Sequence, residues 1–228
     1  MNLKLEQEIN PEVKDEKIAD FSRRRFFQFA GGLAGAGILF SACHKTPPST
    51  FFVGSGDVGL LNYLYILKQV QSNFYIQANN TPYYGMDQNE LELIADLRDH
   101  QLAHRDLLQA ILSSSAIPKI VTNFPTVTFA SRSSVLSYSI LFEDLAVGAI
   151  NGALPLFSNT EYIPYIAKMA SLNARHSAYL RDITTYGTFA DSTVIAANGL
   201  DQALQPLSVM ATLEKYIQTT FDTSKLPN

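Results

Sequence analysis

Cysteine is almost absent from the sequence: Cys43 is the single thiol in 228 residues. One thiol excludes an intramolecular disulfide framework and every metal site built from clustered cysteines. Histidine is also scarce, so any chemistry at an imidazole has to use one of the four histidines, His44, His100, His104 and His176. Basic residues are few as well, with 17 Lys and Arg against 21 Asp and Glu. We therefore expect no nucleic-acid partner, because affinity for phosphates comes from Lys and Arg.

The N-terminal residues are typical of an export signal. Paired arginines, Arg23 and Arg24, stand just before an apolar, Gly- and Ala-rich stretch over residues 29–42. A basic segment, a short apolar run and small residues are the parts of a secretory signal. The paired arginines resemble a twin-arginine export signal. An ordinary secretory signal and a surface helix are the alternatives.

Cys43 ends this segment. Leu39-Phe40-Ser41-Ala42-Cys43 resembles a bacterial lipobox, with Phe40 where Leu is usual. The resemblance implies that Cys43 is lipidated, becomes the first residue after cleavage, and anchors an exported protein in the periplasm or cell envelope. Two acyl chains suffice for stable membrane binding. We predict an export signal over residues 1–43 and a tether over 44–56; a buried structural thiol is the alternative for Cys43.

Four stretches of the remaining chain show helical periodicity. Apolar residues recur three and four positions apart over residues 60–78, 94–111, 136–154 and 166–183, which is the inner seam of a helical bundle. The fold class predicted is all-α, a four-helix bundle over residues 57–188. The third helix, expected over 135–157, is apolar enough for a membrane span, but Glu143 and Asp144 near its middle favour a core helix.

Several residues predict where these helices begin. Asp87 and Glu90 form a capping-box pattern, and Ser131 can cap the third helix. Asn159 or Thr160 can open the fourth helix.

The connections predict the topology. Residues 113–132 are long enough to run the length of the bundle, so the third helix can start at the far end; one long crossover between helices two and three is the ferritin-like arrangement. The tail over 189–228 should hold one short helix, about 206–218, with one apolar face: Leu207, Met210, Leu213 and Ile217.

A polar residue interrupts every apolar seam near its middle. The first and third seams contain Gln71 and Glu143, and the second and fourth contain pairs three residues apart: Gln101 with His104, and Asn173 with His176. A dinuclear carboxylate site in a bundle has the same one-two-one-two layout, with Glu alone on two helices and Glu-x-x-His on the other two. We expect these side chains to point inward at one level.

The chain at this point resembles the ferritin-like, desiccation-related family of exported proteins. Four phrases, one on each helix, carry the resemblance over about residues 55–185: residues 73–75, 99–105, 142–149 and 173–178. The family pattern implies carboxylates at the positions of Gln71, Gln101 and Asn173, and this chain has amides there. Because two irons need carboxylate oxygens to offset their charge, we expect a degenerate site, no di-iron cofactor and a tolerated Glu143→Gln change.

Two functions stay open. The first is a non-catalytic envelope lipoprotein, with a structural, stress-related or partner-binding role and a protein partner that the sequence does not identify. The second is a metalloprotein with oxidase-like chemistry that binds a single divalent metal through His104, Glu143 and His176. His100 lies off the seam and is expected to be a surface or cap residue.

Overall fold

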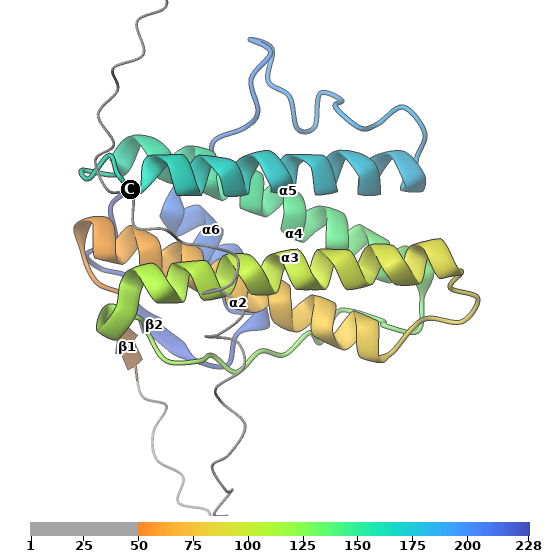
Figure 1. The fold of residues 1–228 in the computed structure, drawn as a ribbon, viewed down its shortest axis with the longest axis horizontal. Coiled ribbons are helices and arrows are strands. Elements are labelled where there is room, and N and C mark those ends of the chain that lie inside the picture. The colour runs from red at the N-terminus through yellow and green to blue at the C-terminus, as the bar shows by residue number, and fades with distance from the viewer. Residues whose placement is uncertain (1–49) are drawn as a thin grey trace, which may run out of the picture. The chain divides into compact units, whose positions relative to one another are not determined.

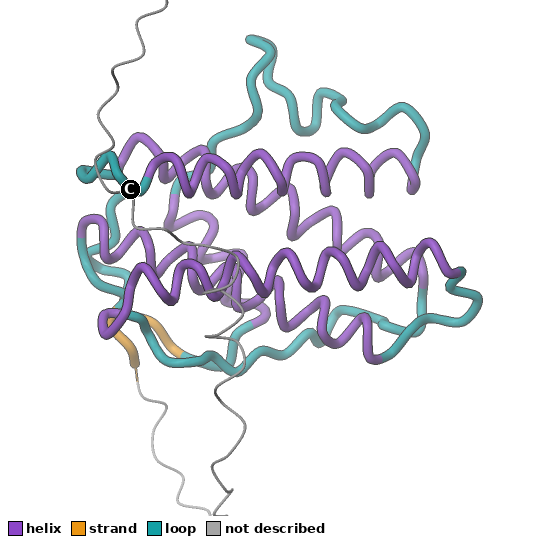
Figure 2. The backbone as a smooth tube through the Cα atoms, in the orientation of Figure 1, coloured by secondary structure: helices purple, strands orange, loops and turns teal. Residues whose placement is uncertain are grey.

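The computed structural model describes residues 50–228. Four long helices form two antiparallel hairpins, α2 with α3 and α4 with α5 (Figures 1 and 2). Their bounds are Gly56–Asn80 for α2, Gln88–Leu112 for α3, Arg132–Ala153 for α4 and Ile163–Thr184 for α5. The predicted all-α bundle is confirmed. The predicted signal, with Arg23, Arg24 and Cys43, lies outside the described residues.

Short elements complete the fold around the four long helices. They are strand β1 (Thr50–Phe52), the 3₁₀ turns η1 (Ser113–Ser115), η2 (Leu154–Leu156) and η3 (Glu214–Tyr216), helix α6 (Pro206–Leu213) and strand β2 (Thr220–Asp222). Strands β1 and β2 pair in parallel. No strand was predicted here, and Val53, within the expected tether, is fully buried. The fold therefore begins several residues earlier than the sequence analysis placed it.

The helix starts follow the predicted caps with one exception. The side chain of Asp87 accepts a hydrogen bond from the backbone N–H of Glu90 at 2.9 Å, and Ser131 caps α4. The Glu90 carboxylate does not return to Asp87; it accepts from Tyr83 and pairs with Arg132. Helix α5 starts at Ile163, not at Asn159 or Thr160, after a turn closed by backbone hydrogen bonds.

Helix α2 is the central helix. Every residue from Gly59 to Ser72 is buried, because α2 is covered by α3, α4, α6 and the crossover together. A helix buried on all sides has no solvent-facing stripe. Any polar residue in this segment must find its partners inside the protein.

The crossover between α3 and α4 runs along α2, as predicted (Figure 1). The Asn62 side chain accepts from the backbone N–H of Ile117 at 3.0 Å, and the Gln69 side chain accepts from that of Ile120 at 2.9 Å. These two contacts lie two turns apart on α2, so the connector follows the axis of that helix. The crossover delivers α4 to the opposite end of the bundle, where Arg132 pairs with Glu90.

Helix α4 with η2, Arg132–Leu156, is the one helix in residues 50–228 that is long and apolar enough to cross a membrane. Its most apolar window is 61% buried within the bundle, which agrees with a core helix. The tail crosses α4 closely: the backbone N–H of Leu204 donates to the Gly148 carbonyl at 2.8 Å. A Cβ on Gly152 would lie 1.9 Å from the Leu204 carbonyl oxygen, so this crossing requires glycine.

The tail helix is shorter than predicted, and its buried face is different. Val209, Met210 and Leu213 are buried against the bundle, whereas Leu207 is 41% exposed. The helix ends before Ile217 because the chain turns through η3 into β2. The predicted face therefore included Leu207 wrongly.

Candidate functional site: a polar layer at the bundle centre

Each of the four long helices places a polar side chain in the same layer. Gln71 of α2, Gln101 of α3, Glu143 of α4 and Asn173 of α5 are each 0% exposed, and His176 of α5 is 9% exposed. The expectation that these side chains point inward is confirmed. The periodicity of the apolar seams alone was sufficient to find them.

Glu143 is the acceptor at the centre of this layer. Its Oε1 accepts from Tyr75 Oη at 2.9 Å and from Gln101 Nε2 at 2.9 Å, with Gln71 Nε2 at 3.4 Å. Its Oε2 accepts from Asn173 Nδ2 at 2.7 Å, and His176 Nδ1 lies at 3.2 Å. Five side chains therefore satisfy one buried carboxylate, which is what a charge removed from water requires.

Lys68 provides the opposite charge, a role that the pattern of the helical seams did not predict. The side chain is fully buried. Its Nζ donates to Gln71 Oε1 at 2.8 Å, Gln101 Oε1 at 2.8 Å and Asn173 Oδ1 at 3.1 Å. An ammonium has three N–H donors, so these three amide oxygens satisfy it completely.

The three amides connect the two charges. Gln71, Gln101 and Asn173 each turn the oxygen toward Lys68 and the nitrogen toward Glu143. This pattern fixes the orientation of all three amides, because a flipped amide would place N–H groups against the ammonium. The result is one network that ties α2, α3, α4 and α5 together.

Burial determines the titration of Lys68. Removal from water lowers its pKa from 10.5 to about 7, and the nearby Glu143 carboxylate opposes part of that effect. The same burial, with the Glu143 charge, raises the pKa of Tyr75 well above its ordinary value, so Tyr75 stays a hydrogen-bond donor. Near neutral pH the layer therefore changes charge at Lys68.

The layer has an imidazole edge, formed by His100, His104 and His176. His176 Nδ1 faces Glu143, so it carries the proton, and His176 Nε2 then accepts from His100 Nδ1 at 3.1 Å. His100 was expected to be a surface or cap residue; it is exposed, yet it bonds directly to the layer. Partial burial of the ring, with a smaller effect of His176, lowers the pKa of His100.

His104 is the incompletely paired member of this edge. Its Nδ1 is buried and has no hydrogen-bond partner among the described residues. Burial, with the nearby charge of Lys68, lowers its pKa to about 2, so the ring is neutral. The structure brings Glu143 and His176 into contact, whereas His104 makes no hydrogen bond to either of them in residues 50–228.

The side chains of the layer do not fit a dinuclear metal centre. The amide oxygens at the three ligand-like positions point at the Lys68 ammonium, and both Glu143 oxygens accept hydrogen bonds. A cation already occupies the middle of the donor set, and a metal ion beside it would be repelled. Within the described part of the chain, no three His, Cys, Asp or Glu side chains converge in a metal-binding geometry.

Two helical hairpins joined by a lengthwise crossover, with a polar layer at the centre, are the arrangement of a ferritin-like bundle. The model for the ferritin-like domain matches residues 56–186, which is more than half of the chain. The chain belongs to the ferritin-like domain family. Its match to that ferritin-like domain spans all four long helices and ends just after α5. No curated protein matches the chain.

Proposed function

We propose that the protein is a lipid-anchored envelope protein whose ferritin-like bundle is non-catalytic and serves a structural, stress-related or partner-binding role. The observation that supports this most is Lys68. An ammonium held by three amide oxygens takes the central position of the layer, and its charge stands in for the charge of a metal.

The geometry explains why the amides and Lys68 belong together. Three carboxylates in place of Gln71, Gln101 and Asn173 would give the layer an excess of buried negative charge, which needs metal ions to offset it. With amides, one lysine balances one glutamate. The bundle therefore gains its central cross-link from Lys68 and Glu143, without depending on an iron supply.

Iron loading tests the metal-free centre. The full-length protein in detergent is incubated with excess Fe²⁺ without oxygen, desalted and assayed for iron. We expect no stoichiometric iron and no iron-dependent oxygen consumption when air is admitted. A matched variant, Lys68→Met with Gln71→Glu, Gln101→Glu and Asn173→Glu, should gain iron binding. Two equivalents of iron bound by the wild type would refute the proposal.

The anchor is tested separately. Expression with export intact, followed by mass spectrometry, should give a chain that starts at a lipidated Cys43. The twin-lysine control, Arg23→Lys with Arg24→Lys, should block export if the paired arginines are read. A mature chain that retains Arg23, or that starts at another residue, would contradict this part of the proposal.

The second candidate is a metalloprotein that binds one divalent ion through His104, Glu143 and His176. The observation in its favour is the buried Nδ1 of His104, which has no hydrogen-bond partner within residues 50–228. It would require Glu143 to release some of the five donors that surround it. In that case a chelator should lower the melting temperature of the wild type, and His104→Gln should abolish that effect.

A further inference from the structure

His100 and His176 are placed as metal ligands are. His100 Nδ1 and His176 Nε2 face each other at 3.1 Å, and the planes of the two rings are nearly parallel, with an interplanar angle of 19°. Two imidazole nitrogens on one tetrahedral ion, at about 2.0–2.1 Å each, lie about 3.3 Å apart. To admit an ion, the two nitrogens would have to separate by a few tenths of an ångström, and each ring would have to turn by roughly 35° so that both lone pairs meet at the ion.

Glu143 supports this arrangement from behind. Metal-binding histidines commonly donate their second ring N–H to a carboxylate, which fixes the tautomer and orients the ring. His176 does so here, with Nδ1 at 3.2 Å from Glu143 Oε2. Nε2 of His176 is therefore the unprotonated nitrogen, and its lone pair points out of the layer toward His100.

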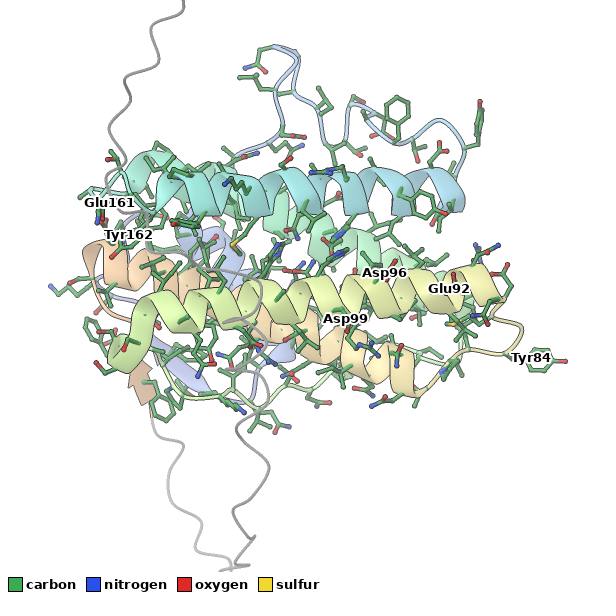
Figure 3. The ribbon with its side chains drawn as sticks, in the orientation of Figure 1. Tyr84, Glu92, Asp96, Asp99, Glu161 and Tyr162 are labelled. Atoms are coloured by element: carbon green, nitrogen blue, oxygen red, sulfur yellow. The ribbon has the colours of Figure 1, made fainter. Side chains whose placement is uncertain are left out.

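The surroundings of the pair are open and acidic. His100 is exposed, and so are Asp96, one turn before it, and Asp99. Figure 3 shows both aspartates on α3 near the solvent side of the bundle. Water can complete the coordination from this side. Lys68, by contrast, lies within the closed part of the layer, where it is bound by the amides.

We propose that His100 Nδ1 and His176 Nε2 bind one divalent transition-metal ion of the class that prefers imidazole, such as Zn²⁺, at the outer edge of the bundle. The ion replaces the hydrogen bond between the rings, and the proton on His100 Nδ1 moves to the other nitrogen of that ring. No charge is gained or lost in the pair. Because His100 is on α3 and His176 on α5, the ion joins the two hairpins.

This site goes beyond the proposed function and does not depend on it. It uses no ligand-like position of the central layer other than His176, and it leaves Lys68 and the amides in place. It also differs from the alternative site formed by His104, Glu143 and His176. Here His100 is the ligand in place of His104, and Glu143 does not bind the ion but accepts a hydrogen bond from His176.

Zinc titration tests the proposal. The full-length protein carries His44→Gln, so that three histidines remain, and Zn²⁺ is titrated calorimetrically at pH 7.5 in a buffer that does not chelate. We expect one Zn²⁺ per chain and a rise in melting temperature on binding. His100→Gln keeps an amide donor for His176 but removes one ligand, so it should weaken binding by more than the roughly tenfold loss that follows from removing an outer-shell partner.

His104→Gln is the matched control, one turn along the same helix, and it should leave zinc affinity unchanged. Loss of binding with His104→Gln would overturn the proposal in favour of the alternative site. Failure to bind Zn²⁺, or binding that His100→Gln leaves intact, would overturn it as well. None of these outcomes involves iron. A failed zinc-site proposal can therefore be distinguished from a failed proposal that the central layer binds no iron.

Discussion

The two sides of the central layer differ in how completely their polar atoms are paired. On the Lys68 side, three donors meet three amide oxygens and the amide nitrogens meet Glu143. On the imidazole side, His100 is exposed and the buried Nδ1 of His104 has no partner in residues 50–228. Complete pairing stabilises a fixed structure, whereas free lone pairs leave room for a ligand.

We therefore expect the Lys68 side of the layer to contribute more to the free energy of unfolding than the imidazole side. Lys68→Met leaves the Glu143 carboxylate buried without its counter-charge, and we expect a loss of about 3–5 kcal/mol in the free energy of unfolding. Chemical denaturation at pH 6 measures it. The exposed Lys168→Met is the control and should change stability by less than about 0.5 kcal/mol. A similarly small loss of stability for Lys68→Met would contradict the larger contribution expected from the Lys68 side.

Glu143→Gln should lower stability by about 3 kcal/mol at pH 6, because Lys68 then keeps a buried charge alone. The sequence alone predicts a tolerated change, because the pattern of the helical seams does not include the buried Lys68 in the layer. The cost should be smaller at pH 9, where Lys68, with its pKa of about 7, is neutral. Adding Lys68→Met to Glu143→Gln should restore most of the stability at pH 6. Equal costs at the two pH values would contradict the pairing of these charges.

The imidazole side should affect stability only in acid. Unfolded His104 takes up a proton near pH 6.5, but the folded protein does so only near its pKa of about 2. The unfolded state binds more protons between these values, so stability falls as pH falls below 6.5, by up to about 1.4 kcal/mol per pH unit. His104→Gln should remove this slope. An unchanged dependence on pH between 6 and 4 would show that His104 is not the group responsible.

The sequence was sufficient to predict the fold and the inward polar positions. Seams of period three and four identify residues by the face of the helix they occupy, so Gln71 and Asn173 could be found without any structure. The crossover was predictable from the length of residues 113–132. Its contacts with Asn62 and Gln69 were not, because those residues lie off the seam and face a segment far away in sequence.

Lys68 and His100 could not be found from the seams. Both lie next to a seam position, Leu67 and Gln101 respectively, and such residues ordinarily face solvent. One signal was available for Lys68: it is the only basic residue between Val58 and Asn80, on a helix without a polar face. The partner of His100 depends on the distance between α3 and α5, which no local pattern encodes.

Lys68 is the cation on which the structure of the central layer depends. An NMR titration of ¹⁵N-lysine-labelled full-length protein from pH 5 to 9, with Lys68→Arg to assign the signal, measures this directly. We predict one lysine ammonium that exchanges slowly with water and titrates near pH 7, while exposed lysines titrate near about 10.4. A Lys68 signal that exchanges fast and titrates with the exposed lysines would contradict the account.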